Sequence, residues 1–170
     1  MTPVIETPRL LLRPFTEADV DALAAIYAVP EVMRYIAGGQ TFDRPATWRS
    51  VATYLGHGVM RGYSILAVVE KSSGRLLGRS GPWYPDGWPG LEVGWVIDRA
   101  RWGEGFATEA GGASRDWCYT ALGAEEVISI IHPDNTRSAR VAERLGARLE
   151  RRLADFSGIP LVDVWVHRRP

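Results

Sequence analysis

The chain has 170 residues, 46% of them hydrophobic, and its 20 basic and 20 acidic residues give a formal net charge of zero. This composition suits one domain, residues 1–170, with a sizeable core, and gives no electrostatic reason to expect nucleic acid or an anionic membrane as a partner. No apolar run reaches the ~20 residues that span a bilayer, and the N-terminal segment lacks a signal-peptide layout, so we expect a cytoplasmic protein. The lone cysteine, Cys118, excludes an internal disulfide and suits a helix core, and the three histidines lack the spacing of a metal site.

The first part of the chain predicts one strand followed by two helices. Residues 9–15, RLLLRPF, form a short apolar strand. Thr16 is placed to cap a helix with Asp19 at the capping-box position, and apolar residues follow at helical spacing until Pro30. A second helix should cover about residues 44–59. Its expected inward face holds Trp48, Val51, Ala52 and Leu55.

The rest of the chain alternates strands and helices. The segments YSILAVVEK and RLLGRSGPWY form a predicted hairpin, and LEVGWVID is a further strand. A helix to about Ala121, the strand EEVISIIH, a helix that Gly146 ends, and two late strands joined by SGI follow. This order predicts an α/β (α+β) fold with a mixed sheet and helices on both faces. A right-handed crossover should make LEVGWVID and EEVISIIH parallel neighbours.

Two glycines, Gly103 and Gly105, lie where the strand LEVGWVID gives way to the next helix. Inside a helix each glycine costs roughly 1 kcal/mol against alanine. The unpaired amides and the dipole of a helix N-terminus favour an anion, and a missing Cβ lets a phosphate oxygen approach the backbone. Alternatively, both glycines only form a turn. The loop is neither a P-loop, which needs a lysine, nor a dinucleotide fingerprint, whose third glycine position holds Thr108.

The stretch WGEGFATEA resembles the acetyl-CoA pyrophosphate loop of the GNAT superfamily of N-acetyltransferases, in the branch of the ribosomal-protein alanine acetyltransferases RimJ and RimL. Four more segments resemble that branch in the correct order: TPRLLLRPFTEADVDALAAIYAVPEVMRYI, LEVGWVID, HPDNTRSARVAERLGA and SGIPLVDVWVH. The resemblance implies a GNAT fold, with a mostly antiparallel sheet of about six to seven strands and two splayed central parallel strands. Trp102 departs from the motif, and Glu104 replaces a common basic residue. Arg99, Arg101 and Arg140 are the candidates for a compensating positive charge.

The resemblance also implies a set of acetyl-CoA contacts. The backbone of Val96 and Ile97 would pair with the pantetheine arm like an added strand. Asn135 would contact pantetheine through its amide, and its alternative role is a helix N-cap. Amides of the loop would hold the pyrophosphate. These cofactor-binding candidates are Trp102, Gly103, Glu104, Gly105, Phe106, Ala107, Thr108 and Arg140.

The candidate catalytic residues are Glu92 and Ser138. Glu92 would remove a proton from the attacking amine, directly or through water, and its alternative role is that of an exposed strand glutamate paired with arginine. By resemblance, Ser138 would protonate the departing thiolate, and its alternative role is that of a solvent-facing helix serine. Four aromatic residues are candidate contacts of an acceptor cleft or ordinary core residues: Trp83, Tyr84, Trp88 and Trp95. Tyr35 is a further candidate acceptor contact.

We therefore expect an N-acetyltransferase that moves an acetyl group from acetyl-CoA to a primary amine by direct attack in a ternary complex. The amine acceptor is a protein N-terminus or a small molecule, and loops at 35–42, 83–90 and 156–160 should select it. The alternatives are a non-catalytic acyl-CoA-binding module with a regulatory role and a structural domain. We expect no metal, no nucleic-acid or membrane partner, and a monomer or homodimer.

Overall fold

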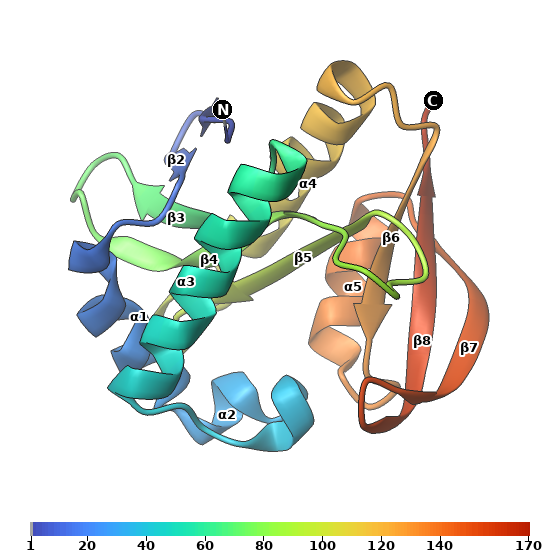
Figure 1. Ribbon diagram of the computed structural model, residues 1–170. Coiled ribbons are helices and arrows are strands. Elements are labelled where there is room, and N and C mark those ends of the chain that lie inside the picture. The colour runs from blue at the N-terminus through green and yellow to red at the C-terminus, as the bar shows by residue number, and fades with distance from the viewer. Residues whose placement is uncertain (1) are drawn as a thin grey trace.

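The computed structural model describes residues 2–170, which form one eight-stranded sheet with helices on both faces (Figure 1). The strands are β1 (Ile5–Glu6), β2 (Leu10–Arg13), β3 (Leu66–Glu70), β4 (Leu76–Trp83), β5 (Glu92–Ile97), β6 (Glu126–Ile131), β7 (Arg148–Phe156) and β8 (Ile159–Arg168). The α-helices are α1 (Val20–Tyr27), α2 (Pro30–Met33), α3 (Arg44–Arg61), α4 (Phe106–Ala121) and α5 (Thr136–Arg144).

The strand order is β1-β2-β3-β4-β5-β6-β8-β7, and within residues 2–170 the only parallel pair is β5 with β6. The predicted mixed, mostly antiparallel sheet is therefore confirmed. It has one strand more than expected, because the two-residue β1 precedes the first predicted strand and pairs with β2. Between residues 2 and 170, no helix combines the length and hydropathy that a bilayer crossing requires.

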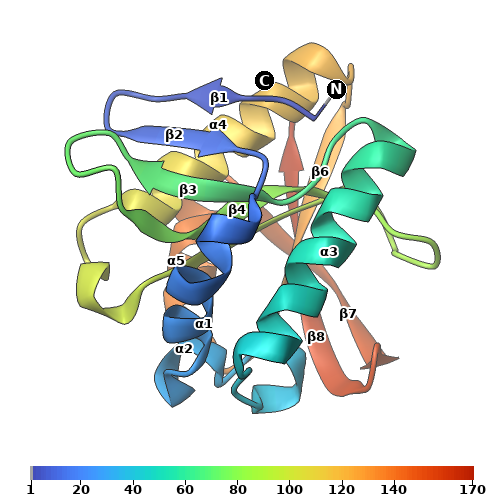
Figure 2. The same cartoon turned by 60° about the vertical axis from the view of Figure 1, so that its left-hand side comes forward.

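Helices cover the sheet from two sides, with α1 and α3 in front of it and α4 behind it (Figure 2). Strand β3 is buried on both faces, as its apolar sequence LAVVE suggests. Its Leu66 and Val68 pack with Phe106 of α4, whereas Ala67 and Val69 belong to the core on the side of α1 and α3. The expected capping box before α1 is present, with Thr16 and Asp19 as its partners.

Helix α3 turns a different face to the sheet from the one predicted. Val51 is buried as expected, but Trp48 and Leu55 are 47% and 41% exposed, and Ala52 is exposed as well. The inward face instead includes buried polar residues whose groups find local partners. The Thr47 hydroxyl donates to the Asp43 carbonyl at 2.8 Å, and His57 Nδ1 donates to the Tyr63 carbonyl at 2.8 Å. The prediction from apolar residues alone therefore placed the wrong face of α3 against the sheet.

Strands β5 and β6 pair only at one end and then diverge, running apart downward in Figure 1. Glu92 lies opposite Ile128, whose amide donates to the Leu91 carbonyl at 2.8 Å. The Ser129 hydroxyl donates to the Val93 carbonyl at 2.7 Å, and no register pair follows it. The later residues of β5 thus have an open backbone edge on the β6 side. The predicted splay of the central parallel strands is confirmed.

Candidate active site

Two cavities lie at the divergence of β5 and β6. The first, of about 610 Å³, is bounded by the end of β5, by residues 102–105, which we call the glycine loop, and by α5. We call it the loop cavity. The second, of about 330 Å³, is bounded by β4, β5 and several aromatic side chains, and we call it the aromatic cavity. Five residues line both cavities, and we call this place the junction. They are Tyr35, Ile36, Trp95, Asn135 and Ser138.

Backbone dominates one wall of the loop cavity. Val96 and Ile97 line it from the open edge of β5, and all the predicted loop residues except Glu104 line it from the start of α4. Gly103 and Gly105 have φ values of +86° and +83°, which only glycine adopts without strain. The first amides of α4 have no partner within the helix, so this wall offers hydrogen-bond donors to an anion.

The two loop glycines differ in what a side chain would meet. A Cβ at Gly103 would have no atom within 4 Å, whereas a Cβ at Gly105 would lie 3.5 Å from Nη2 of Arg9, behind the loop. The expectation that a missing Cβ makes room for phosphate therefore does not explain Gly105. Its positive φ does.

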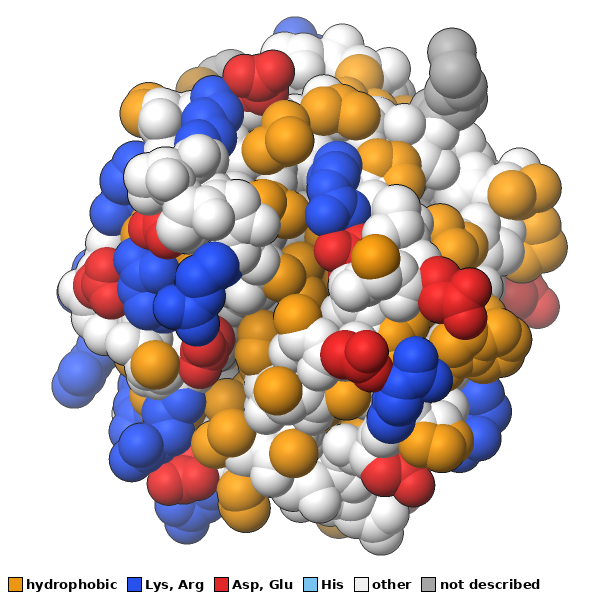
Figure 3. All heavy atoms as spheres, turned by 90° about the vertical axis from the view of Figure 1, so that its left-hand side faces the viewer, with side chains coloured by type: hydrophobic (Ala, Val, Ile, Leu, Met, Phe, Trp, Pro, Cys, Tyr) orange, Lys and Arg blue, Asp and Glu red, His pale blue; other side chains and the backbone are white. Residues whose placement is uncertain are grey.

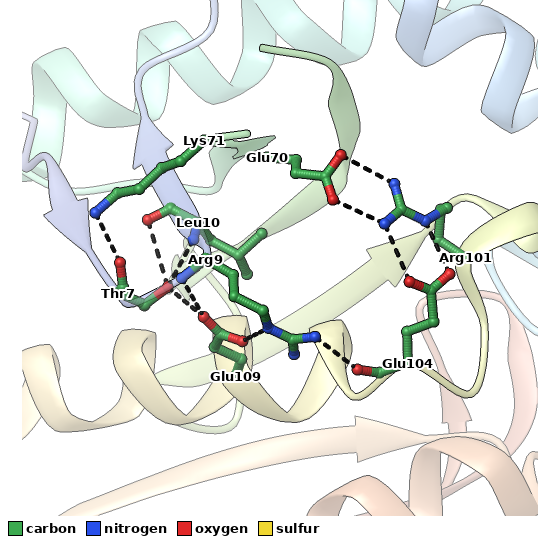
Figure 4. Close-up of polar contacts among 8 residues, drawn as sticks. All are labelled: Thr7, Arg9, Leu10, Glu70, Lys71, Arg101, Glu104 and Glu109. Carbon is green, nitrogen blue, oxygen red and sulfur yellow. Dashed lines mark hydrogen bonds and ion pairs between the residues drawn. The ribbon is translucent and has the colours of Figure 1, made fainter. Parts of the chain in front are cut away.

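An ion-pair network behind the loop fixes the position of Glu104 (Figure 4). Arg101 donates to both carboxylate oxygens of Glu104, at 2.8 and 3.0 Å, and lowers the pKa of that carboxyl. Arg9 donates to the Glu104 carbonyl at 3.0 Å and pairs with Glu109 at 2.6 Å. The Glu104 side chain therefore points away from the loop cavity, and its negative charge is already balanced. Only its backbone amide can serve the role predicted for it.

Positive charge reaches the loop cavity from α5 more than from the loop. Arg137, Arg140 and Arg144 line the cavity along one side of α5, and Arg34 lines it from the end of α2. The sequence prediction named Arg140 among these. The spacing of three and four residues on a helix was a signal for the other two residues of α5.

Two other arginines, Arg99 and Arg101, were expected to supply positive charge to the loop cavity, but their guanidinium groups pair with acidic side chains. Arg99 does not line the loop cavity and pairs with Glu31 at 3.3 Å. Arg101 lines the cavity, but its hydrogen bonds go to Glu70 and Glu104. Arg137 differs from both, because it forms no ion pair within the described residues 2–170 and its guanidinium lies 4.3 Å from the centre of the Trp102 ring.

Trp102 anchors the loop to β5. Its Nε1 donates to the Ile97 carbonyl at 2.8 Å, and its ring packs against both large apolar clusters. The departure from the motif at this position thus has a structural basis, because the indole both holds the loop and supports Arg137.

The junction brings together Asn135 and Ser138. Asn135 Oδ1 accepts a hydrogen bond from the Ser138 amide at 3.2 Å, so the N-cap role of Asn135 is confirmed. Its side chain lines both cavities at the same time, which leaves the predicted cofactor contact open to test. The Ser138 hydroxyl forms no hydrogen bond with residues 2–170 and also lines both cavities. Tyr35 closes the junction from the other side and lies against His132, with ring centroids 5.0 Å apart.

The aromatic cavity draws its walls from the three loops that the sequence singled out. Residues 35–37, Trp88 and three residues of the last loop contribute, with Trp83 at the end of β4; the three are Phe156, Ser157 and Ile159. Trp83 stacks on His57 with ring centroids 4.3 Å apart, and Trp88 meets Phe156 edge to face at 4.8 Å. These contacts hold the aromatic rings in place around the cavity.

Glu92 begins β5 inside the aromatic cavity, opposite Trp83 of β4. Burial raises the pKa of Glu92 to about 6, although the hydrogen bond from Trp88 and the charge of Arg79 act to lower it. Trp88 Nε1 donates to Glu92 Oε2 at 2.6 Å. Glu92 forms no ion pair within residues 2–170, so the alternative of an exposed, arginine-paired glutamate is wrong. A carboxylate with this pKa is mostly ionised at pH 7 and can accept a proton.

Arg79 of β4 is a lining residue that the sequence reasoning missed. Its Nε donates to the Tyr27 hydroxyl at 2.6 Å, and its guanidinium lies 5.7 Å from the centre of the Tyr54 ring. The available signal was an arginine in the middle of the apolar strand LLGRSGPW, a position where charged residues are rare unless paired.

The lone cysteine lies outside the two cavities. Cys118 is buried in α4, and burial raises its thiol pKa to about 12, which agrees with the expected core role. Residues 2–170 contain no group of three His, Cys, Asp or Glu side chains arranged to hold a metal ion. On the face seen in Figure 3, basic and acidic side chains lie among one another and among hydrophobic ones.

Comparisons with known proteins agree on one family. The family model described as an acetyltransferase (GNAT) domain matches residues 9–148. The crystal structure of an acetyltransferase from Agrobacterium tumefaciens str. C58 is 31% identical, with a TM-score of 0.87 over 99% of this chain and 96% of that chain. The uncharacterized N-acetyltransferase p20 of Bacillus licheniformis is 27% identical over 164 residues, 94% of this chain and 92% of the relative.

The fold extends to a ribosomal-protein acetyltransferase. The structure of RimL, a ribosomal L7/L12 alpha-N-protein acetyltransferase in complex with coenzyme A, has a TM-score of 0.80 over 98% of each chain, at 17% identity. That likeness concerns the fold, as the resemblance to this branch implied. With a family model that covers most of the sequence and a solved relative that is 31% identical, the chain belongs to the GNAT family of acetyltransferases.

Proposed function

We propose that this protein transfers the acetyl group of acetyl-CoA to a primary amine, which attacks directly while both substrates are bound. The observation that carries the proposal is the junction, where an amide-lined cavity meets a second cavity that contains a carboxylate with a raised pKa. Transfer from a thioester needs such an arrangement, because the amine and the acyl carbon must approach within about 3–3.5 Å in a defined orientation.

The residues of the loop cavity fit the three parts of coenzyme A. On the open side of β5 the Ile97 amide can donate to a carbonyl of an extended pantetheine arm, whereas the Ile97 carbonyl already accepts from Trp102 Nε1 and Val96 pairs with Arg79 of β4. The glycine loop offers unpaired amides to a pyrophosphate, and Arg137 and Arg140 add positive charge next to it. When bound there, acetyl-CoA supplies the thioester, and its acyl end would reach the junction at Asn135 and Ser138.

Glu92 has the role of base in this proposal. It takes a proton from the amine, directly or through a water molecule, as the nitrogen lone pair forms a bond to the acyl carbon. The carbon–sulfur bond breaks, and the electron pair leaves with the sulfur, which takes a proton from the Ser138 hydroxyl or from water. A free thiol has a pKa near 8.5, so the sulfur is a tolerable leaving group and Ser138 is needed only in part.

The test measures coenzyme A binding by calorimetry and thiol release from acetyl-CoA with a panel of amines. The panel contains free amino acids, their amides, short peptides and alkylamines. We expect coenzyme A to bind, one or more amines to release thiol, and Glu92→Gln to lose turnover while it keeps its coenzyme A affinity. Binding without thiol release for the whole panel would favour a regulatory binding module, and an absence of binding would overturn the assignment of the loop cavity.

A further inference from the structure

Two head groups of opposite charge lie near one glycine, Gly94, in the floor of the aromatic cavity. On β4 and β5 the pairs Arg79↔Val96, Gly81↔Gly94 and Trp83↔Glu92 follow one another, and alternation puts all six residues on the same face of the sheet. The central glycine pair leaves the floor without side chains. A Cβ at Gly94 would lie 3.6 Å from Glu92 Oε1 and 4.0 Å from Arg79 Nη1.

These two charges do not satisfy each other. Within the described part of the chain, residues 2–170, Arg79 forms no ion pair, either with Glu92 or with any other acid. Its one side-chain hydrogen bond runs from Nε to the Tyr27 hydroxyl, and burial raises the pKa of Tyr27, so the phenol stays neutral. A guanidinium has five N–H donors, so its two terminal nitrogens keep their hydrogens for the cavity.

Other partly buried arginines of this chain have carboxylate partners. Arg13 pairs with Asp19 at 2.7 Å, and Arg101 pairs with Glu70 at 2.8 Å. Glu92 acts on the charge of Arg79 only from a distance, and a charge removed from water without a hydrogen-bonded counter-charge is costly. The planar guanidinium fork matches a carboxylate in a two-bond contact. The missing partner of Arg79 is thus best supplied by a ligand that carries a carboxylate.

We propose that the acceptor is a free amino acid, whose carboxylate binds Arg79 and whose amine faces Glu92. This inference rests on the proposed function and names its substrate class. Because both head groups lie around Gly94, the amine and the carboxylate of the ligand must be only a few bonds apart, as in an α- or β-amino acid. The rings of Tyr54, Trp83 and Trp88 line the same cavity and suit an apolar side chain.

A peptide N-terminus fits this floor less well. Next to its amine it carries an amide carbonyl in place of a carboxylate, so it would bring an amine to Glu92 but leave the Arg79 charge without a partner. A volume of about 330 Å³ is at the lower end of the range for small-molecule sites, which also favours a compact ligand.

Arg79 has a second possible role, which the test must separate from ligand binding. Its charge acts to lower the pKa of Glu92, and its Nε holds Tyr27 in place. If that were its whole function, its loss would slow the acetylation of every amine by the same factor. A carboxylate contact instead affects only acceptors that carry a carboxylate.

The experiment compares kcat/KM for matched acceptors, each corrected for its fraction of neutral amine. The acceptors are alanine, methionine and phenylalanine, the amide of each, and a peptide that begins with each. The proteins are the wild type, Arg79→Met, which keeps the length of the side chain, and Arg79→Lys, which keeps the charge but not the fork. Arg75→Met serves as the matched control, since Arg75 is exposed in the turn before β4 and lines neither cavity.

We expect the wild type and Arg75→Met to prefer an amino acid over its amide by about 10²-fold, the effect of a charge-assisted contact. In Arg79→Met this preference should fall to within threefold of unity, mostly through a higher KM for the amino acid, and Arg79→Lys should lie between. Amides or peptides that react as well as amino acids in the wild type would overturn the inference, as would an equal loss for both in Arg79→Met. If Arg79→Met does not fold, the wild-type ratio alone decides. A wild type that acetylates an alkylamine but none of these acceptors would overturn the inference and leave the proposed function standing, whereas a wild type that acetylates no amine at all would contradict the proposed function.

Discussion

Arg101 donates two hydrogen bonds to the carboxylate of Glu70, at 2.8 and 3.1 Å, and so ties the glycine loop to the end of β3 (Figure 4). The same guanidinium holds Glu104, and it lies 4.8 Å from the centre of the Phe106 ring at the start of α4. Hydrogen bonds from Arg101 lower the pKa of Glu70 to about 2. The network therefore stays ionised over the whole pH range in which an enzyme of this kind would be assayed.

Glu70→Gln should weaken coenzyme A binding about three- to tenfold without unfolding the protein. The substitution removes one of the two charges that hold Arg101, so the loop amides lose part of their fixed orientation. Calorimetry with coenzyme A measures the effect, and Glu6→Gln is the control, because Glu6 pairs with Lys71 at an exposed site away from both cavities. Equal affinities for wild type and Glu70→Gln would show that the network has no part in shaping the loop.

Arg137→Ala should weaken coenzyme A binding about tenfold at low salt and by less at high salt. Arg137 lines the loop cavity and stacks on Trp102, whereas Arg99 does not line it and pairs with Glu31. Screening by salt reduces contacts between exposed charges, so the difference between the wild type and Arg137→Ala should shrink as salt is raised. Arg99→Ala should bind like the wild type, and a larger effect there than at Arg137 would contradict the cavity assignment.

Two substitutions at Asn135 separate its cap role from its predicted cofactor role. Asn135→Ala should lower the stability by about 1 kcal/mol, the usual effect of losing a cap, and should also raise the coenzyme A dissociation constant. Asn135→Ser should keep the cap and the melting temperature but still bind coenzyme A more weakly, because serine lacks the amide. Unchanged affinity in the stable Asn135→Ser protein would leave Asn135 as a cap only.

Glu92→Gln should lower kcat/KM at pH 7 by about 10²–10⁴-fold, which is the usual contribution of a positioned base. Because burial raises the pKa of Glu92 to about 6, the wild-type rate should fall as the pH drops through 6. Raising the pH should partly restore the variant, since more of the amine is then neutral without help. Superimposable pH–rate profiles for the two proteins would remove Glu92 from the mechanism.

The same carboxylate should make the folded protein less stable at neutral pH. A pKa raised from 4.5 to about 6 means that the fold favours the protonated form, so stability falls as the pH rises from 4.5 through 6. The loss is at most about 2 kcal/mol for a group buried to this extent. Melting curves should therefore show Glu92→Gln gaining on the wild type between pH 4.5 and 7.5. A stability difference that does not change with pH would contradict this account.

Local sequence was enough to predict the order of elements and most of the loop cavity. The loop cavity could be predicted because its main parts are adjacent in the sequence. They are the strand LEVGWVID, the two glycines and the start of the following helix. Helical periodicity could also have identified Arg137 and Arg144, since they share a side of α5 with Arg140. The face of α3 was predicted wrongly because Thr47 and His57 are polar yet satisfied by nearby carbonyls, which no count of apolar residues reveals.

The aromatic cavity depended on contacts between distant parts of the chain. Arg79 and Glu92 come together only through the register of β4 against β5, with Gly81 opposite Gly94 between them. Likewise, Glu104 turns away from the loop cavity because Arg101 and Arg9 hold it, and Arg9 is 95 residues away in the sequence. Sequence reasoning could name the residue types but not these pairings.

The divergence of β5 from β6 places an unfinished edge in the middle of the sheet instead of at its rim. An exposed edge strand can pair with a strand of another chain, which makes it a site of aggregation. This interior edge is flanked by the glycine loop and α5, so a ligand reaches it through the loop cavity. Whatever completes the sheet there becomes part of the architecture for as long as it is bound, and should raise the melting temperature in proportion to the logarithm of its concentration.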